Sequence, residues 1–134
     1  MNLEEIVNEY DKEMVEDCKI TSFNCLDKQM MLPAIKHKWV GRIVRLKVDI
    51  ENLKSKKNEI KNRLMEKKKS ENPINFSDAI VEKQIAKLDA IIKIESDIKS
   101  STILLSYLSD CHAILASMTY DFNNISKLIA MEQE

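Results

Sequence analysis

The sequence predicts an all-α protein built from long helices with heptad spacing. Its 134 residues include one glycine and two prolines, whereas a sheet protein of this size needs several turns built on such residues. Hydrophobic residues make up 44 %, enough for a core, and helix-forming Leu, Ile, Lys, Glu and Met are abundant. Apolar positions recur at alternating steps of four and three along two long segments. The length is that of one compact unit without independent domains.

The first predicted element is a short amphipathic helix over residues 3–16. Acidic residues occupy one face, and the other face carries the apolar positions Leu3, Ile6, Val7, Tyr10 and Met14. Residues 17–22 are expected to form a connection in which Thr21 or Ser22 caps the next helix.

The second element is a long helix from Trp39 to Leu64, about 39 Å in length. Pro33 is expected to end an earlier turn or to kink the helix near its start. Lys57 interrupts the apolar seam, which predicts either a functional role for this side chain or a water-filled gap. Residues 68–76 are expected to form a loop. The seam consists of Trp39, Ile43, Leu46, Ile50, Leu53, Lys57, Ile60 and Leu64.

The last part of the chain predicts a helix over residues 78–98, with Ser77 as its N-cap, and then a second heptad seam. This seam is flanked by further apolar residues, so one short chain is not expected to cover it. We therefore predict a homo-oligomer whose contact lies on the C-terminal helix. The residues predicted for this contact are Leu104, Leu108, Leu115, Met118, Phe122, Ile125 and Ile129.

Charge is distributed unevenly along the chain. Residues 36–69 hold thirteen of the twenty-one Lys and Arg residues but only four acids, although the whole chain has a net charge of −1. A basic segment on an acidic body indicates a polyanionic partner, most often nucleic acid. The alternatives are a merely solvated helix face, an acidic protein partner and an anionic lipid surface.

No catalytic, cofactor or metal site is predicted. The two histidines are far apart, there is no phosphate-binding or zinc-protease motif, and one glycine cannot form a glycine-rich phosphate loop. Three cysteines without a CxxC motif predict idle thiols rather than disulfides or a zinc site. No apolar run is long enough to span a bilayer, and the acidic N-terminus does not resemble a signal peptide. We expect neither an enzyme nor a membrane protein.

Three motifs occur in the order found in a known family. Lys38-Trp39-Val40 starts the basic helix, and Lys61-Asn62-Arg63-Leu64 lies near its end. Lys93-Ile94-Glu95 is followed by Ile103-Leu104-Leu105 and Tyr107, where the C-terminal seam begins. With these motifs and its length, the chain resembles the UvsY family, the recombination mediators of T4-like bacteriophages.

The resemblance implies a hexameric or heptameric ring held by C-terminal helices in the cytoplasm of the infected bacterial host. It implies binding to single-stranded DNA without sequence preference, and contacts with a RecA-like phage recombinase and a phage single-strand-binding protein. The implied role is loading of that recombinase onto covered strands. The aromatic and glycine residues that the best-known member of the family carries just after Lys-x-Arg-Leu are absent here, so charge alone is expected to hold the strand. The DNA-binding residues implied or expected on this basis are Lys61 and Arg63 first, then Lys54, Lys57, Lys67, Lys68 and Lys69.

Along the sequence, residues 1–76 are expected to carry the DNA-binding helix and residues 77–134 the oligomerisation region. The alternative function is a structural or adaptor coiled-coil protein that binds an acidic protein. Both interpretations predict heptads and oligomers. They differ in the ligand, because only the mediator function requires binding to single-stranded DNA.

Overall fold

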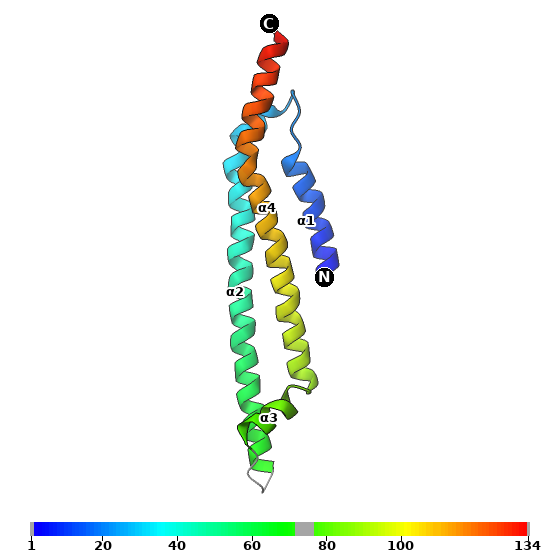
Figure 1. Cartoon of the computed structure of the whole chain (residues 1–134), viewed down its shortest axis with the longest axis vertical. Helices are drawn as coiled ribbons and strands as arrows, with labels where there is room; N and C mark the ends of the chain where they lie inside the picture. The colour runs from blue at the N-terminus through cyan, green and yellow to red at the C-terminus, as the bar shows by residue number, and fades with distance from the viewer. Residues whose placement is uncertain (1, 72–76, 134) are drawn as a thin grey trace. The chain divides into compact units, whose positions relative to one another are not determined.

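The computed structural model describes residues 2–71 and 77–133, and its regular structure there consists of four helices. They are α1 (Leu3–Cys18), α2 (Cys25–Glu71), α3 (Asp78–Ile85) and α4 (Asp89–Gln133) (Figure 1). No strand occurs among the described residues, which confirms the predicted all-α class. Within the same residues, no helix combines the length and the apolar content that crossing a membrane requires.

The internal packing divides the chain into two compact units. Unit 1 comprises Met1–Arg45 and Leu104–Glu134, and unit 2 comprises Leu46–Ile103. Helices α2 and α4 therefore each contribute one segment to each unit. The predicted division of roles at residue 76 stays a prediction, and each unit contains residues from both sides of it.

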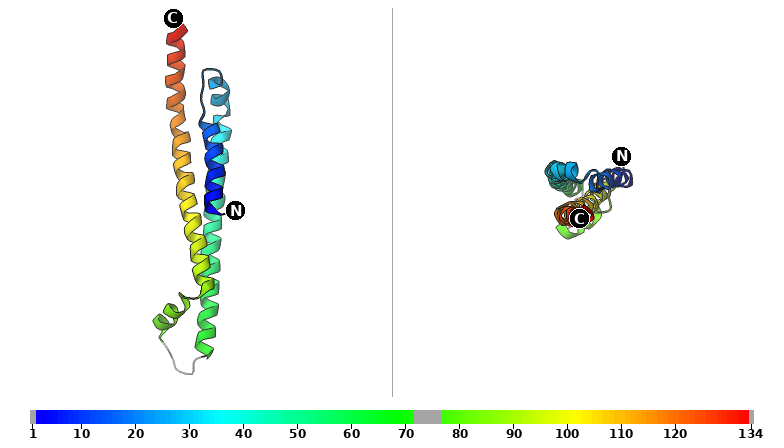
Figure 2. Two further views of the ribbon diagram at one scale, coloured as in Figure 1. Left: turned by 90° about the vertical axis from the view of Figure 1, so that its right-hand side faces the viewer. Right: turned by 90° about the horizontal axis from the view of Figure 1, so that it is seen from above.

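Unit 1 packs α1, the first part of α2 and the second part of α4 against one another (Figure 2). Its core includes Trp39 and Leu115, both completely buried, together with Leu108 and Phe122 at 1 % exposure. The C-terminal heptad seam is thus buried largely by the chain's own helices. At the end of α1, the Lys28 ammonium group donates to the Glu16 carbonyl oxygen and so satisfies an acceptor there.

Helix α2 begins earlier than predicted and continues through Pro33. Proline lacks the N–H that would bond to the carbonyl of Gln29, so the interruption costs one backbone hydrogen bond. Leu32, Ile35 and Trp39 are buried around it, and this packing outweighs the local penalty. Thr21 accepts from the Asn24 backbone N–H at 3.2 Å and so caps the turn before α2, whereas the prediction was that Thr21 or Ser22 caps the helix itself, which begins at Cys25.

Helix α2 also ends later than predicted, because residues 68–71 are helical instead of belonging to a loop. The other predicted loop residues, 72–76, lie outside the described residues. Ser77 caps α3 as predicted, since its side chain accepts from the Ile80 backbone N–H.

The predicted helix over residues 78–98 is wrong, because the chain breaks between Ile85 and Asp89. The break contains neither glycine nor proline, so no local signal marks it. Burial explains it instead: Val81, Ile85 and Ile91 form one cluster in unit 2, and a bend brings residues from both sides of the break into it. The partly buried side chains packed against this cluster are Ile60, Leu64, Met65 and Leu88.

Candidate nucleic-acid interface

The first basic residues of α2 hold α1 in place. The Lys38 ammonium group lies 2.7 Å from an oxygen of Asp17 and 2.9 Å from one of Glu13. The Arg42 guanidinium group pairs with Glu13 at 2.8 Å and stacks on the rings of Tyr10 and Trp39. These two positive charges are therefore neutralised within the chain.

These ion pairs shift the pKa values of their members. The hydrogen bond from Arg42 lowers the pKa of Glu13, against the opposing effect of burial, and Lys38 lowers it further. Burial alone would lower the pKa of Lys38, but its hydrogen bonds to Asp17 and Glu13 outweigh burial and raise it. The Lys38-Trp39 motif thus has a structural role, and it leaves the later part of α2 as the candidate binding surface.

Unit 2 carries two rows of bases on α2. Residues seven apart lie on one side of a helix, so Lys54, Lys61 and Lys68 form one row, and Lys56 and Arg63 form the other. The apolar seam runs between the rows and faces α3 and α4. Both rows therefore flank the packed face of the helix.

Most of the predicted DNA contacts have an acidic partner. Lys57 pairs with Glu95 at 3.0 Å, Lys61 with Glu82 at 3.3 Å, and Lys69 with Asp78 at 2.6 Å. Lys54 and Lys67 pair within α2, with Glu51 at 3.5 Å and Glu71 at 4.0 Å, and Lys68 also has an interaction partner. These side chains are partly or largely exposed, so such pairs are weak and exchangeable.

Arg63 differs from the other predicted contacts. It is exposed, and among the described residues no acid pairs with it. The bases of α2 that share both properties are Arg45, Lys47, Lys56 and Arg63. Sequence reasoning did not single out Lys56 as a contact, although its seven-residue spacing from Arg63 is the signal that finds it.

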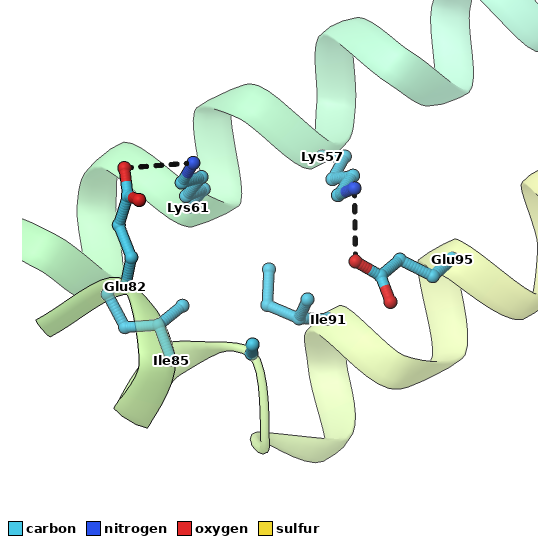
Figure 3. A pocket seen from close by; sticks show the side chains of 7 residues that line it. Lys57, Lys61, Glu82, Ile85, Ile91 and Glu95 are labelled. Carbon is cyan, nitrogen blue, oxygen red and sulfur yellow. Dashed lines mark ion pairs between the residues drawn. The ribbon is translucent and has the colours of Figure 1, made fainter. Parts of the chain in front are cut away.

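Lys57 and Lys61 line a cavity of about 200 Å³ in unit 2. Figure 3 shows the two lysines on α2 opposite Glu82 of α3 and Glu95 of α4, with Ile85 and Ile91 between them. Lys57 therefore interrupts the apolar seam because it reaches a carboxylate on the facing helix. The described His, Cys, Asp and Glu side chains form no group of three or more that could hold a metal ion.

The residues predicted for oligomer contact lie mainly inside unit 1. Leu104, Leu108, Leu115, Met118 and Phe122 are buried by the chain itself, at 8 % exposure or less. Ile125 and Ile129 are half-buried. The first five therefore belong to the core that the chain forms by itself. The large apolar side chains that α4 exposes in unit 1 are Ile114, Tyr120, Leu128 and Met131.

The three cysteines are unbonded, and Cys25 and Cys111 are buried. Burial raises the pKa of the Cys111 thiol and of the neighbouring Tyr107 hydroxyl, and it likewise raises that of Cys18. Thiols of this kind stay protonated and unreactive near neutral pH. Their environment is therefore that of packing residues.

No family model matches the chain, and no curated protein sequence matches it. Solved structures, in contrast, do match the chain. A crystal structure of the bacteriophage T4 recombination mediator protein UvsY superimposes with a TM-score of 0.78 at 16 % identity, covering 98 % of this chain and 99 % of that one. A second crystal form of the same protein gives a TM-score of 0.73 at 12 % identity, covering 95 % and 97 %. The chain therefore has a UvsY-like fold.

Proposed function

We propose that this chain is a phage recombination mediator that binds single-stranded DNA and loads a RecA-like recombinase onto strands covered by single-strand-binding protein. The observation that carries the proposal is structural similarity over nearly the full length of both chains to a protein named as a recombination mediator. The order of the three sequence motifs supports the same conclusion independently of the fold. The proposed role is binding and assembly, without catalysis.

The proposed DNA contact lies on the unit 2 part of α2. Arg63 is the strongest candidate because it is exposed and has no acidic partner among the described residues. Lys61 lies two residues before it, and its pair with Glu82 is half-exposed. Contacts from such bases to phosphate carry no sequence information, as a mediator requires. The further proposed contacts are Lys54, Lys57, Lys67, Lys68 and Lys69.

We propose that the chain acts as a homo-oligomer, a hexamer or heptamer, joined through α4. Of the residues predicted for the contact, Ile125 and Ile129 are only half-buried within the chain. The exposed Leu128 and Met131 extend the apolar surface that they form. Copies of the basic segment would then bind one strand together, so that a modest affinity per chain becomes a large avidity. A strand held by several copies is presented to the recombinase, which displaces the single-strand-binding protein.

A titration tests the binding step. A fluorescent single-stranded oligonucleotide and its duplex are each titrated with the protein at two salt concentrations. We expect binding to the single strand in preference to the duplex, weakening steeply with salt at a log–log slope of about −0.7 per phosphate contact. Binding no stronger than that of an unrelated basic protein, and without preference for single strands, would instead favour the adaptor function.

A further inference from the structure

Two of the proposed DNA-binding lysines form ion pairs with carboxylates of the same chain. Lys57 and Lys61 lie one helical turn apart on α2, and their ammonium groups are 3.0 Å and 3.3 Å from carboxylate oxygens of Glu95 and Glu82. The carboxylates come from different helices and enter the same cavity from opposite ends (Figure 3). A single site thus contains two cations, each neutralised by a separate acid.

The site is built to keep these acids near the lysines. Glu82 lies on α3, between the buried residues Val81 and Ile85, which fix that helix in the unit 2 cluster. Ile85 and Ile91 contribute apolar surface to the lining of the cavity. Glu95 follows the buried Ile94 on α4. Both acids therefore lie on helices that packing holds in place, so their proximity to the lysines is a property of the fold.

The ion pairs are nevertheless open to exchange. Lys57 and Lys61 are 33 % and 38 % exposed, and Glu95 and Glu82 are 49 % and 50 % exposed. Pairs at this exposure are weakly held. A nucleic-acid strand offers neighbouring phosphates to both lysines at once, and its binding also releases condensed counterions. A strand can therefore replace the carboxylates, whereas a single small anion gains neither advantage.

We propose that Glu82 and Glu95 are built-in competitors of DNA phosphate: they hold Lys61 and Lys57 in the free chain and are displaced when single-stranded DNA binds. This inference rests on the proposed function. Its consequence is that the chain restrains its own affinity for isolated anions and short strands. Only a strand that spans both lysines displaces both acids.

The test removes one acid at a time without removing its volume. Glu82→Gln and Glu95→Gln are each expected to tighten binding of a single-stranded oligonucleotide about two- to fivefold at low salt, the range that an exposed ion pair allows. The matched control is Glu59→Gln, which makes the same charge change at an exposed position of α2 whose side chain pairs with no described residue. Circular dichroism of every variant verifies that the helices are retained.

A double-mutant cycle then separates local competition from a general gain in positive charge. In a Lys61→Ala background, Glu82→Gln should no longer tighten binding, because the cation that it frees is absent. A gain that persists in that background, or one no larger than that of Glu59→Gln, would overturn the inference while leaving the proposed function intact. Failure of the wild-type chain to bind single-stranded DNA would overturn both.

Discussion

The indole Nε1 of Trp39 donates a hydrogen bond of 2.8 Å to Asp17, and this bond joins the completely buried core of unit 1 to its ion-pair cluster. The same Asp17 oxygen accepts from Lys38 at 2.7 Å. A buried indole usually needs such an acceptor for its N–H, so one carboxylate satisfies both neighbours. This arrangement fixes α1 on α2 and explains why Lys and Trp occur together in the sequence.

Trp39→Ala should destabilise the chain by about 3–5 kcal/mol, because it removes a fully buried aromatic side chain and leaves a cavity. Trp39→Phe should cost less, since it keeps most of the packing but loses the bond to Asp17. Urea unfolding followed by circular dichroism measures both effects. Val40→Ala is the neighbouring control, at 38 % exposure, and should change stability by less than about 0.5 kcal/mol. Equal losses at the two positions would contradict the burial of Trp39.

The Glu13 cluster predicts a loss of stability in acid. The pKa of the Glu13 carboxyl group is lower in the folded chain than its ordinary value of 4.5. The stabilisation that its ion pairs contribute is therefore fully present above pH 4.5 and is lost as the pH falls through the pKa of the folded chain. Glu13→Gln should therefore flatten the dependence of the urea midpoint on pH below about 4.5, and should lower the midpoint at neutral pH. Glu9→Gln, an exposed change on the same helix, is the control. An unchanged acid profile in Glu13→Gln would contradict the assigned pairing.

Lys61→Ala and Arg63→Ala should each weaken binding to single-stranded DNA and flatten its salt dependence. For each substitution the log–log slope is expected to become shallower by about 0.7 per chain, since one phosphate is no longer neutralised. Fluorescence titration over a series of salt concentrations measures the slope. Lys12→Ala, which removes an exposed charge from α1, should leave it nearly unchanged. Wild-type affinity of the double variant at every salt concentration would refute the site.

The exposed and the buried apolar residues of α4 should respond differently when one of them is replaced by a charged residue. Leu128→Asp, at a position 59 % exposed, should yield smaller species in sedimentation velocity while helicity is retained. Leu108→Asp and Phe122→Asp should instead lower the stability of the chain, because each places a charge in its core. Asn124→Asp adds the same charge at an exposed polar position and serves as the control. A full-sized oligomer from Leu128→Asp would exclude this part of α4 from the contact.

Much of this fold could be predicted from the sequence because the long helices carry a regular seam. The C-terminal heptads correctly identified a buried face, and Ser77 correctly marked the start of α3. The partner of the buried face could not be predicted, since a heptad pattern reports that a face is covered without reporting by what. Five predicted oligomer residues are in fact covered by the chain's own helices.

Two of the differences between the predicted and observed helices share one physical cause. The sequence predicts an end or a kink at Pro33, but α2 continues through it among buried neighbours. The actual break before Asp89 has no local signal and follows from the burial of Ile85 and Ile91. Long-range packing decided both positions.

At the candidate site, the lysines could be predicted from charge and spacing, with Lys57 as the one charged residue in the apolar seam. The opposing Glu82 and Glu95 could not, because only the folded chain brings them close.

The proposed mediator function is tested most directly by reconstitution with a RecA-like phage recombinase, its single-strand-binding protein and long single-stranded DNA. The measurement is the DNA-dependent ATP hydrolysis of the recombinase on strands that are fully covered before it is added. We predict that the wild-type chain shortens the lag and restores the rate, and that the Lys61→Ala, Arg63→Ala double variant does so poorly. An unchanged lag with the wild-type chain, under conditions where the recombinase is active on bare strands, would contradict the proposed function.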